Sequence, residues 1–433
     1  MAAYNLTNSG INYKVIGNVI LCMSHFFSTY LNLRQYFKQN DRRMPKKLKD
    51  LKGYELSSDE FFKTKEYNAE RMAFTIVKSS IELIITVFLI MVNYYPLVWE
   101  SCFQYTDSMY LSIILFTIIE TLRGTLLDIP FSYYHTFYLE SKYEFNKTTH
   151  KTFIADKIKG VLLTLIIGNV FYCLITFIME YFQEQFVVIA WVATTILTLV
   201  IVFLYPSVIA PLFNKFENLD QNNEKEKSIQ TELEQLCKDI GFPLGKIYKM
   251  DGSKRSAHSQ AYFFGLFGKK QIVIYDTLIE KTSVKEILAI VGHELGHWKH
   301  KHNVVMIVMQ VSVIGIFLST LSLMLENDKF YYDFGFSNKY YFIGLTMFSI
   351  FFVPLNIIIH AISCFITRLC EYQADRFSVH LNKGQELLDG LIHIYKDNKG
   401  DPDPDHLYAL FNHTHPNLLQ RAQAIQLELS KRK

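Results

Sequence analysis

The chain has 433 residues, of which half are hydrophobic, 15% are aromatic and 20% are charged, and its formal net charge is +3. Large apolar residues are too frequent for a disordered chain, and the net charge is too small to indicate a nucleic-acid-binding protein. Six scattered cysteines form no CxxC pair, which excludes a disulfide-rich scaffold. Because long apolar runs alternate with dense charge, the composition indicates a membrane protein with a large water-exposed part.

Seven apolar stretches are long enough to cross a bilayer core, which needs about 20 residues of helix. They cover residues 15–33, 74–99, 109–127, 160–179, 186–213, 303–325 and 340–367. The first has no clear cleavage site behind it and is expected to be an anchor. Nearly all of the 44 lysines and arginines lie in alternate connections between these stretches. The positive-inside rule then predicts an N-terminus outside or in the lumen and a C-terminus in the cytosol.

Two of the stretches contain pairs of opposite charges. Lys78 and Glu82 are four residues apart, and Glu120 and Arg123 are three apart, so each pair shares one face of its helix. The members of each pair either neutralise one another near a membrane surface or face a wet interior cavity. The sequence leaves both interpretations open.

The longest polar segment, residues 214–302, is expected on the cytosolic side. Apolar residues at helical spacing predict an amphipathic helix over 228–240, and short strands are expected at 246–250 and 271–275. The predicted fold is an all-α polytopic membrane protein with seven transmembrane helices and a cytosolic-side domain that contains a small β-sheet. The expected segments are 1–213 (first five spans), 214–302 (cytosolic insert), 303–367 (last two spans) and 368–433 (C-terminal helical segment).

The chemistry of the insert lies on a helix that is expected to begin at Ser283, which fits a capping box with Glu286, and to run through residues 287–302, with a direct continuation into the sixth stretch left open. This helix contains His293-Glu294-Leu295-Gly296-His297, the HExxH pattern. Histidines four residues apart present two nitrogen ligands to one zinc ion, and the glutamate beside the first can act on water at the metal. The alternative is a pair of ordinary surface histidines on a charged helix.

Catalytic zinc needs a third protein ligand and an open position. Glu371 and Asp375 follow the seventh stretch and are four residues apart, so they share a helical face. Glu371 is a candidate zinc ligand, and Asp375 is a candidate hydrogen-bond partner of a ligand histidine. A solvated acidic face is the alternative. His300 is a rival ligand, although one helix does not easily place three ligands around a tetrahedral ion.

With these motifs, the chain resembles the type I CAAX prenyl proteases, a family of integral-membrane zinc endopeptidases. The resemblance covers most of the chain, and its ordered motifs are 129–132, Glu140, 145–148, 255–258, 261–263, 291–299, His302, 371–375, 415–416 and Arg421. It implies a ring of seven helices around a large water-filled chamber, capped by a cytosolic-side metallopeptidase domain. It further implies a membrane address in the endoplasmic reticulum or the inner nuclear membrane.

The family activity is removal of the last three residues from proteins that end in a prenylated cysteine plus three residues, and some members make a second cut further upstream. The resemblance therefore implies one Zn2+ per chain, a prenylated protein or peptide as substrate, the lipid bilayer as a partner, and no nucleic acid. It makes His293, His297 and Glu371 the zinc ligands, Glu294 the general base, and Asp375 the outer partner of the ligands.

The resemblance also assigns residues that would contact the substrate. His415 and Arg421 would support the reacting carbonyl, where a donor such as His415 stabilises the developing oxyanion. The family usually has Ser-His-Pro with a second proline, whereas this chain has Thr414-His415-Pro416-Asn417. A stretch around Gln260, Ala261, Tyr262 and Phe263 is expected either to be an exposed edge strand that pairs with the substrate backbone or to be a plain core strand.

Three other classes of protein share part of this pattern. A seven-span receptor or transporter fits the spans and their orientation but not the HExxH pattern on the longest insert. A membrane quality-control zinc protease shares HExxH and a later glutamate but generally has fewer spans. An intramembrane-cleaving zinc protease is disfavoured because charged residues flank the HExxH pattern on both sides.

Overall fold

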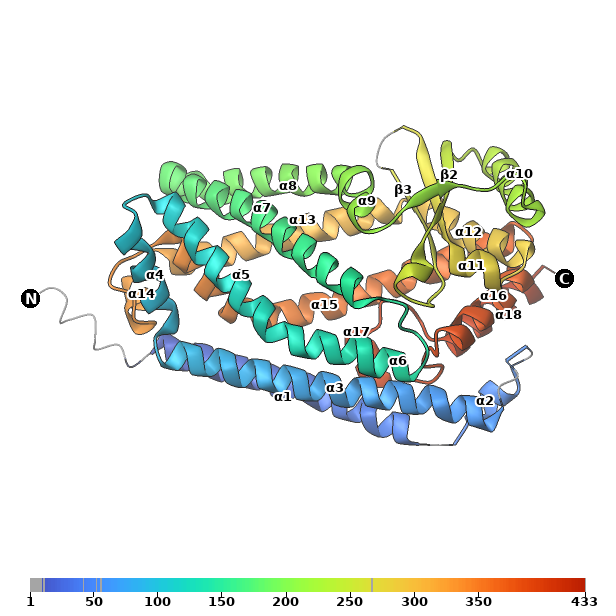
Figure 1. Ribbon diagram of the computed structural model, residues 1–433, viewed down its shortest axis with the longest axis horizontal. Helices are drawn as coiled ribbons and strands as arrows, with labels where there is room; N and C mark the ends of the chain where they lie inside the picture. The colour runs from blue at the N-terminus through green and yellow to red at the C-terminus, as the bar shows by residue number, and fades with distance from the viewer. Residues whose placement is uncertain are drawn as a thin grey trace, which may run out of the picture.

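Long helices run side by side along the longest axis of the molecule, and a small sheet with shorter helices forms one end (Figure 1). The computed structural model describes residues 10, 12–41, 43–51, 53–54, 57–265 and 268–432. The long helices are α1 (Tyr13–Asn40), α3 (Ser58–Met91), α4 (Tyr94–Tyr105), α5 (Met109–Tyr134), α7 (His150–Phe182), α8 (Phe186–Leu204), α13 (His302–Leu325) and α15 (Tyr341–His380). At the sheet end lie α10 (Glu224–Ile240), α11 (Asp276–Lys281), α12 (Val284–Lys299), α16 (Gly384–Asp397) and α18 (Leu418–Ser430). Further short helices are α2 (Lys46–Lys49), α6 (Glu140–Lys142), α9 (Ala210–Phe213), α14 (Asp328–Asp333) and α17 (His406–Asn412).

Five helical stretches of the described residues are long and apolar enough to cross a membrane. They are Ser58–Met91, Met109–Lys142, His150–Phe213, His302–Leu325 and Tyr341–His380. The stretch His150–Phe213 contains both α7 and α8, which fold back on one another at a short turn over Gln183–Gln185 (Figure 1). Helix α1 is not one of the five stretches, although it packs along α3 (Figure 1).

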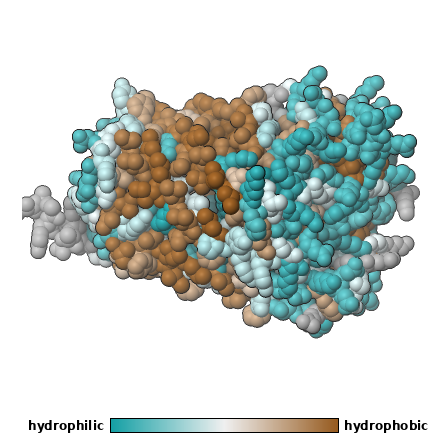
Figure 2. All heavy atoms as spheres, viewed as in Figure 1, coloured by the Kyte–Doolittle hydropathy of each residue, from teal (hydrophilic) through white to brown (hydrophobic). Residues whose placement is uncertain are grey.

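The surface of these helices explains why the chain needs a membrane. Apolar residues cover the half of the molecule formed by the long helices, whereas polar residues cover the sheet end (Figure 2). In the most apolar part of each stretch, only a minority of the residues are buried inside the protein, and the largest share is 44%, in Tyr341–His380. The remaining apolar side chains face outward, and an apolar belt of this extent is unfavourable in water. The protein is therefore a multi-pass membrane protein.

The second predicted span, residues 74–99, is wrong at its C-terminal end. Helix α3 ends at Met91, and Asn93 adopts a left-handed conformation with φ 56° before α4 begins. Pro96 lies in the first turn of α4, where its missing N–H breaks no helical hydrogen bond. Trp99 of α4 is fully buried, and its ring stacks on Phe342 of α15 at 5.2 Å. The segment after Asn93 therefore covers one end of the helix bundle.

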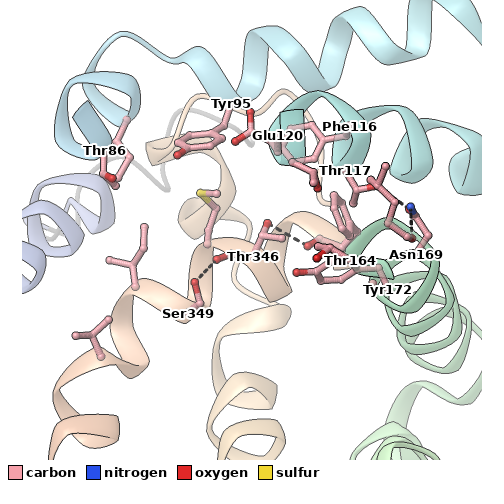
Figure 3. A pocket seen from close by; sticks show the side chains of 18 of the residues that line it. Thr86, Tyr95, Phe116, Thr117, Glu120, Thr164, Asn169, Tyr172, Thr346 and Ser349 are labelled. Carbon is pink, nitrogen blue, oxygen red and sulfur yellow. Dashed lines mark hydrogen bonds between the residues drawn. The ribbon is translucent and has the colours of Figure 1, made fainter. Parts of the chain in front are cut away.

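A cavity of about 510 Å³ lies between α1, α3, α5, α7 and α15 at this end (Figure 3). Hydroxyl and amide groups line part of it, and Thr117 Oγ1 donates to Asn169 Oδ1 at 2.6 Å. Glu120 also lines this cavity and pairs with Arg123 at 2.6 Å, so this charged pair borders interior space. Lys78 instead pairs with Asp128 of α5 at 2.7 Å, and it lies 3.7 Å from Glu82.

The sheet has four strands, and its order is β1-β2-β4-β3. The strands are β1 (Phe216–Asn218), β2 (Leu244–Met250), β3 (Ala261–Phe264) and β4 (Lys270–Tyr275). Strands β2 and β4 are parallel and confirm the two predicted strands, and β3 pairs antiparallel to β4 at the edge. The predicted amphipathic helix is α10, which ends where Gly241 adopts φ 72°. Apolar residues of α10 and α12 pack with the sheet in one core.

The helix with the HExxH pattern does not run through to His302, contrary to the prediction, and it does not continue directly into the sixth span. Helix α12 ends at Lys299, Lys301 adopts a left-handed conformation with φ 58°, and α13 begins at His302. The predicted capping box at its start is confirmed, since Ser283 and Glu286 hydrogen-bond reciprocally. By contrast, α15 runs unbroken for 40 residues, from the predicted seventh span through Glu371 and Asp375.

Candidate active site

Two helices from distant parts of the chain bring the predicted metal ligands together. His293 and His297 lie one turn apart on α12, and Glu371 projects from α15, which packs against α12. The His293 and His297 Nε2 atoms are 3.1 Å apart. Glu371 Oε2 lies 3.4 Å from His293 Nε2, and Glu371 Oε1 lies 3.3 Å from His297 Nε2. The possible ligand atoms of these three residues all lie within 4.8 Å of one another, as they would around a bound metal ion.

The dimensions of this triangle fit a small tetrahedral cation. An ion with bonds of about 2.0–2.1 Å to nitrogen and oxygen separates its ligands by about 3.3–3.4 Å. The observed separations of 3.1–3.4 Å match that edge length. Glu371 Oε2 is also buried, and its nearest charged neighbours, His293 Nε2 at 3.4 Å and Arg421 at 3.7 Å, make no hydrogen bond to it within the described part of the chain. Because a buried carboxylate oxygen without a partner is costly, the donor set is suited to a metal ion.

His293 is held from behind by a buried pair of charges. Its Nδ1 lies 2.9 Å from Asp375 Oδ1, so the Nε2 lone pair can face the metal position. Arg421 of α18 contacts both Asp375 oxygens, at 2.6 and 2.9 Å. Burial lowers the pKa of His293, but the neighbouring carboxylates of Asp375 and Glu371 prevail and raise the pKa to about 9. The carboxylates thus favour positive charge at this point.

Arg421 lies behind His293 and also 3.7 Å from Glu371 Oε2, and the role predicted for it at the reacting carbonyl stays a prediction. Arg421 is only 5% exposed. Its guanidinium faces Asp375 and lies 3.4 Å from His293 Nδ1. An arginine fork matches a carboxylate with two parallel hydrogen bonds, and Asp375 occupies that fork. Arg421 therefore orients Asp375 behind the ligands.

His297 has an outer partner that the sequence interpretation missed. His302 Nδ1 lies 2.9 Å from His297 Nδ1, and His302 Nε2 lies 2.9 Å from Gln373 Oε1. With the Gln373 oxygen as the acceptor, His302 would carry its proton on Nε2 and accept the Nδ1 proton of His297. This relay leaves His297 Nε2 unprotonated. The spacing of His302 after His297 was visible in the sequence, but the left-handed Lys301 that turns it back was not.

His300, the rival ligand, does not join the metal group. It is exposed at the end of α12, and its ring stacks on His302 at 5.6 Å between centroids. Glu294, the predicted base, is half-buried on α12 beside the two ligand histidines. Burial raises the pKa of the Glu294 carboxyl above its ordinary value, against the lowering effect of His293.

A loop after α17 brings His415 to the same point. His415 Nε2 lies 3.3 Å from Glu371 Oε1, and Thr414 Oγ1 lies 2.9 Å from His415 Nδ1. The His415 side chain is 59% exposed, so its surroundings do little to hold it. The backbone is held instead, because Arg368 of α15 donates to the carbonyls of Ala409 and His413 at 3.1 and 2.6 Å.

The predicted substrate strand is the edge strand β3. Ala261 is buried, Tyr262 and Phe263 are half-buried, and Gln260 is exposed just before the strand begins. One side of β3 pairs with β4, and the sheet order leaves the other side free of a strand. An unpaired edge presents backbone N–H and C=O groups that an extended peptide can bind.

The sequence matches two family descriptions that together cover most of the chain. Residues 33–215 match "CAAX prenyl protease N-terminal, five membrane helices", and residues 223–429 match "Peptidase family M48". The chain is 33% identical to the CAAX prenyl protease 1 homolog of Dictyostelium discoideum over 432 residues, which is 97% of this chain and 98% of that protein. The chain belongs to the type I CAAX prenyl protease family.

Other members of the CAAX prenyl protease family agree in sequence and in structure. The homolog of Mus musculus is 30% identical, and the match covers 95% of each chain. The crystal structure of S. mikatae Ste24p superposes with a TM-score of 0.89 at 31% identity, and the match covers 96% of this chain and 99% of that one. As a member of this family, the protein is a membrane metalloendopeptidase, which excludes a non-enzymatic receptor or transporter.

Proposed function

We propose that the protein is a zinc endopeptidase that removes the last three residues from prenylated CAAX proteins. The observation that carries this proposal is the triangle of His293, His297 and Glu371, whose dimensions suit zinc with nitrogen and oxygen ligands. The substrate class follows from family membership, because the relatives are named CAAX prenyl proteases. A second, upstream cleavage is compatible with the same site.

The chemistry divides among residues of this chain. A zinc ion held by the three ligands would supply the Lewis acidity that peptide hydrolysis requires at neutral pH. Glu294 takes a proton from the attacking water and passes it to the leaving amine. His415 donates from Nε2 to the developing oxyanion. If His415 Nδ1 accepts a hydrogen bond from the Thr414 hydroxyl, the ring proton must lie on Nε2. Asp375 and Arg421 keep His293 in the tautomer that binds metal.

The substrate backbone would lie along the free edge of β3. Main-chain hydrogen bonds to residues 260–263 would hold an extended peptide in a defined register without reading its side chains. The exposed Gln260 lies at one end of this edge. Such pairing suits an enzyme that must accept the tails of different proteins.

We further propose seven membrane passes, formed by α1, α3, α5, α7, α8, α13 and α15. The apolar outer face of α1, with Met23 and Phe26 more than two-thirds exposed, supports its inclusion. The bias of lysine and arginine supports a lumenal N-terminus and a cytosolic C-terminus. The metal centre would then face the cytosol, and the membrane would be that of the endoplasmic reticulum. The expected segments remain 1–213, 214–302, 303–367 and 368–433.

The proposal is tested with the purified full-length protein and a farnesylated peptide that ends in a CAAX sequence. We expect release of the last three residues, loss of activity with a chelator, and recovery with Zn2+. The Glu294→Gln variant should keep the metal but lose turnover, because the glutamate moves a proton and binds no metal. Equal cleavage of the unprenylated peptide would favour a quality-control protease, and near-wild-type turnover of Glu294→Gln would overturn the base assignment.

A further inference from the structure

A second cavity, separate from the one in Figure 3, lies beside the loop that carries His415. Its volume is about 350 Å³, and its walls come from α1, α3, α16, α17 and the segment between α16 and α17. Polar and apolar groups both line it, and the polar ones include Asn68, Arg71, Asn398, Lys399, Tyr408 and His413. Helix α17, which lines the cavity, packs against α15 on one side and α1 on the other (Figure 1).

Two cations that make no direct ion pair within the described part of the chain line the cavity. Arg71 forms no direct ion pair with any residue that the structure describes, its charge also acts on Glu140, and its guanidinium lies 5.3 Å from the centre of the Tyr67 ring. Lys399 Nζ donates to the carbonyl of Tyr143 at 3.3 Å and likewise forms no ion pair within the described part of the chain. Asp401, the acid of the lining, already accepts a hydrogen bond from Gln35 at 2.6 Å. The charge of the cavity is therefore complementary to an anion.

The cavity lies within a short peptide's length of the metal ligands. His413 lines it and precedes His415 by two residues, which span at most about 7 Å of chain. On its other side, Asn398 Oδ1 accepts a hydrogen bond from the backbone N–H of Ser259, two residues before β3. Three residues of extended peptide span about 10 Å. A tripeptide that begins at the metal centre therefore reaches this cavity.

The direction of the edge strand agrees with this placement. A substrate that pairs antiparallel to β3 directs its C-terminus toward the N-terminal end of that strand. That end lies next to Ser259, whose contact with Asn398 borders the cavity. The anion that such a peptide carries at its end is its own α-carboxylate.

We propose that this cavity binds the C-terminal carboxylate of the substrate, with Arg71 as the anchor. The inference rests on the proposed function, since it concerns the tripeptide that the enzyme would release. An arginine fork binds a carboxylate through two parallel hydrogen bonds, which a lysine does not reproduce. The fixed distance from Arg71 to the metal centre would then set the position of the scissile bond three residues from the chain end.

The test uses two farnesylated peptides that differ only at the C-terminus, one a free acid and the other an amide. A charge-assisted hydrogen bond predicts that the wild-type protein cleaves the acid about 10- to 100-fold more efficiently, measured as kcat/KM. Arg71→Ala should remove most of this preference by lowering turnover of the acid while leaving that of the amide unchanged. Arg71→Lys should give an intermediate preference. Lys63→Ala removes an exposed cation of α3 outside the cavity and should behave as wild type.

The amide peptide makes the outcomes distinguishable. If the wild-type protein cleaves both peptides equally well, or if Arg71→Ala leaves the preference intact, the carboxylate site is overturned and the proposed function stands. If Arg71→Ala slows both peptides alike, Arg71 acts on the structure and the carboxylate site is again overturned. If the wild-type protein cleaves neither peptide, the proposed function fails, and the carboxylate site fails with it.

Discussion

The contact between α12 and α15 at Gly296 makes the metal centre sensitive to one added methyl group. A Cβ at Gly296 would lie 2.9 Å from Ala374 Cα and 3.1 Å from both Ala374 O and Phe377 Cβ. Ordinary carbon contacts are about 3.5–4.0 Å. Two of these three contacts involve backbone atoms of α15, which cannot rotate away. The Gly296→Ala substitution must therefore separate the two helices by about 0.5–1 Å.

This separation is large compared with the tolerance of a metal site. Metal–ligand distances hold to about 0.2 Å, and Glu371 lies on the helix that moves while His293 and His297 lie on the other. Overpacking costs about 1–3 kcal/mol, whereas replacing a helical glycine by alanine gains about 1 kcal/mol. We expect a small net loss of stability and a loss of metal affinity of about 10- to 100-fold, because each 1.4 kcal/mol of distortion costs a factor of about ten.

The matched control is Gly292→Ala, one turn earlier on the same helix. Its Cβ would lie 3.4 Å from Ser378 Oγ, which is an ordinary contact, so this variant gains the helix propensity without the clash. The assay is metal content after dialysis against a graded series of chelator concentrations, with thermal unfolding measured in parallel. Wild-type metal affinity in Gly296→Ala would refute the argument, as would an equal loss in both variants.

Three further predictions concern the groups around the metal position. Glu371→Ala should release the metal, because only the two histidines of α12 remain; unchanged metal content would point to another acid as the third ligand. His302→Ala should lower metal affinity about 10- to 100-fold by removing the acceptor for His297 Nδ1, and it should leave a measurable residual affinity. His300→Ala is its control, and a comparable loss there would contradict the relay. Asp375→Asn should lower stability by about 3 kcal/mol, seen as a lower unfolding temperature of the metal-free protein, because the buried Arg421 loses its nearest charged partner and keeps only the more distant Glu371. An unchanged unfolding temperature would show that this pair does not hold α18 against α15.

Local sequence pattern was enough to predict which of the candidate side chains share a helical face, whereas the choice of Glu371 as third ligand came from the family resemblance. His293 and His297 share a helical face by spacing alone, and so do Glu371 and Asp375, whatever the rest of the chain does. The capping box at Ser283 and the two parallel strands were predictable for the same reason, since each depends on residues close together in sequence.

Features that depend on distant packing were not predictable in this way. Nothing in the propensity of lysine indicates that Lys301 adopts a left-handed conformation, yet this residue separates α12 from α13 and turns His302 toward His297. The burial of Arg421 is likewise decided by how α18 meets α15. The break at Asn93 is different, because Pro96 is a signal for a new helix start that hydropathy alone overlooks.

The loop that carries His415 shows how the membrane helices and the site depend on one another. Three aspartates at alternate positions, Asp401, Asp403 and Asp405, attach the segment before α17 to the first helix. Asp405 pairs with Arg34 at 2.9 Å, and Asp403 pairs with Lys38 at 2.8 Å. Each exposed pair contributes at most about 1 kcal/mol, so none of them alone fixes the loop.

Together with Arg368, these pairs hold both ends of α17. Arg368 lies three residues before the proposed ligand Glu371 on α15, and it donates to the last carbonyls of α17. The aspartates bind α1 at the other end. A half-exposed histidine has few contacts of its own to keep it 3.3 Å from Glu371. His415 therefore takes its position from the backbone of a segment that is fixed between the first helix and the helix of the third ligand.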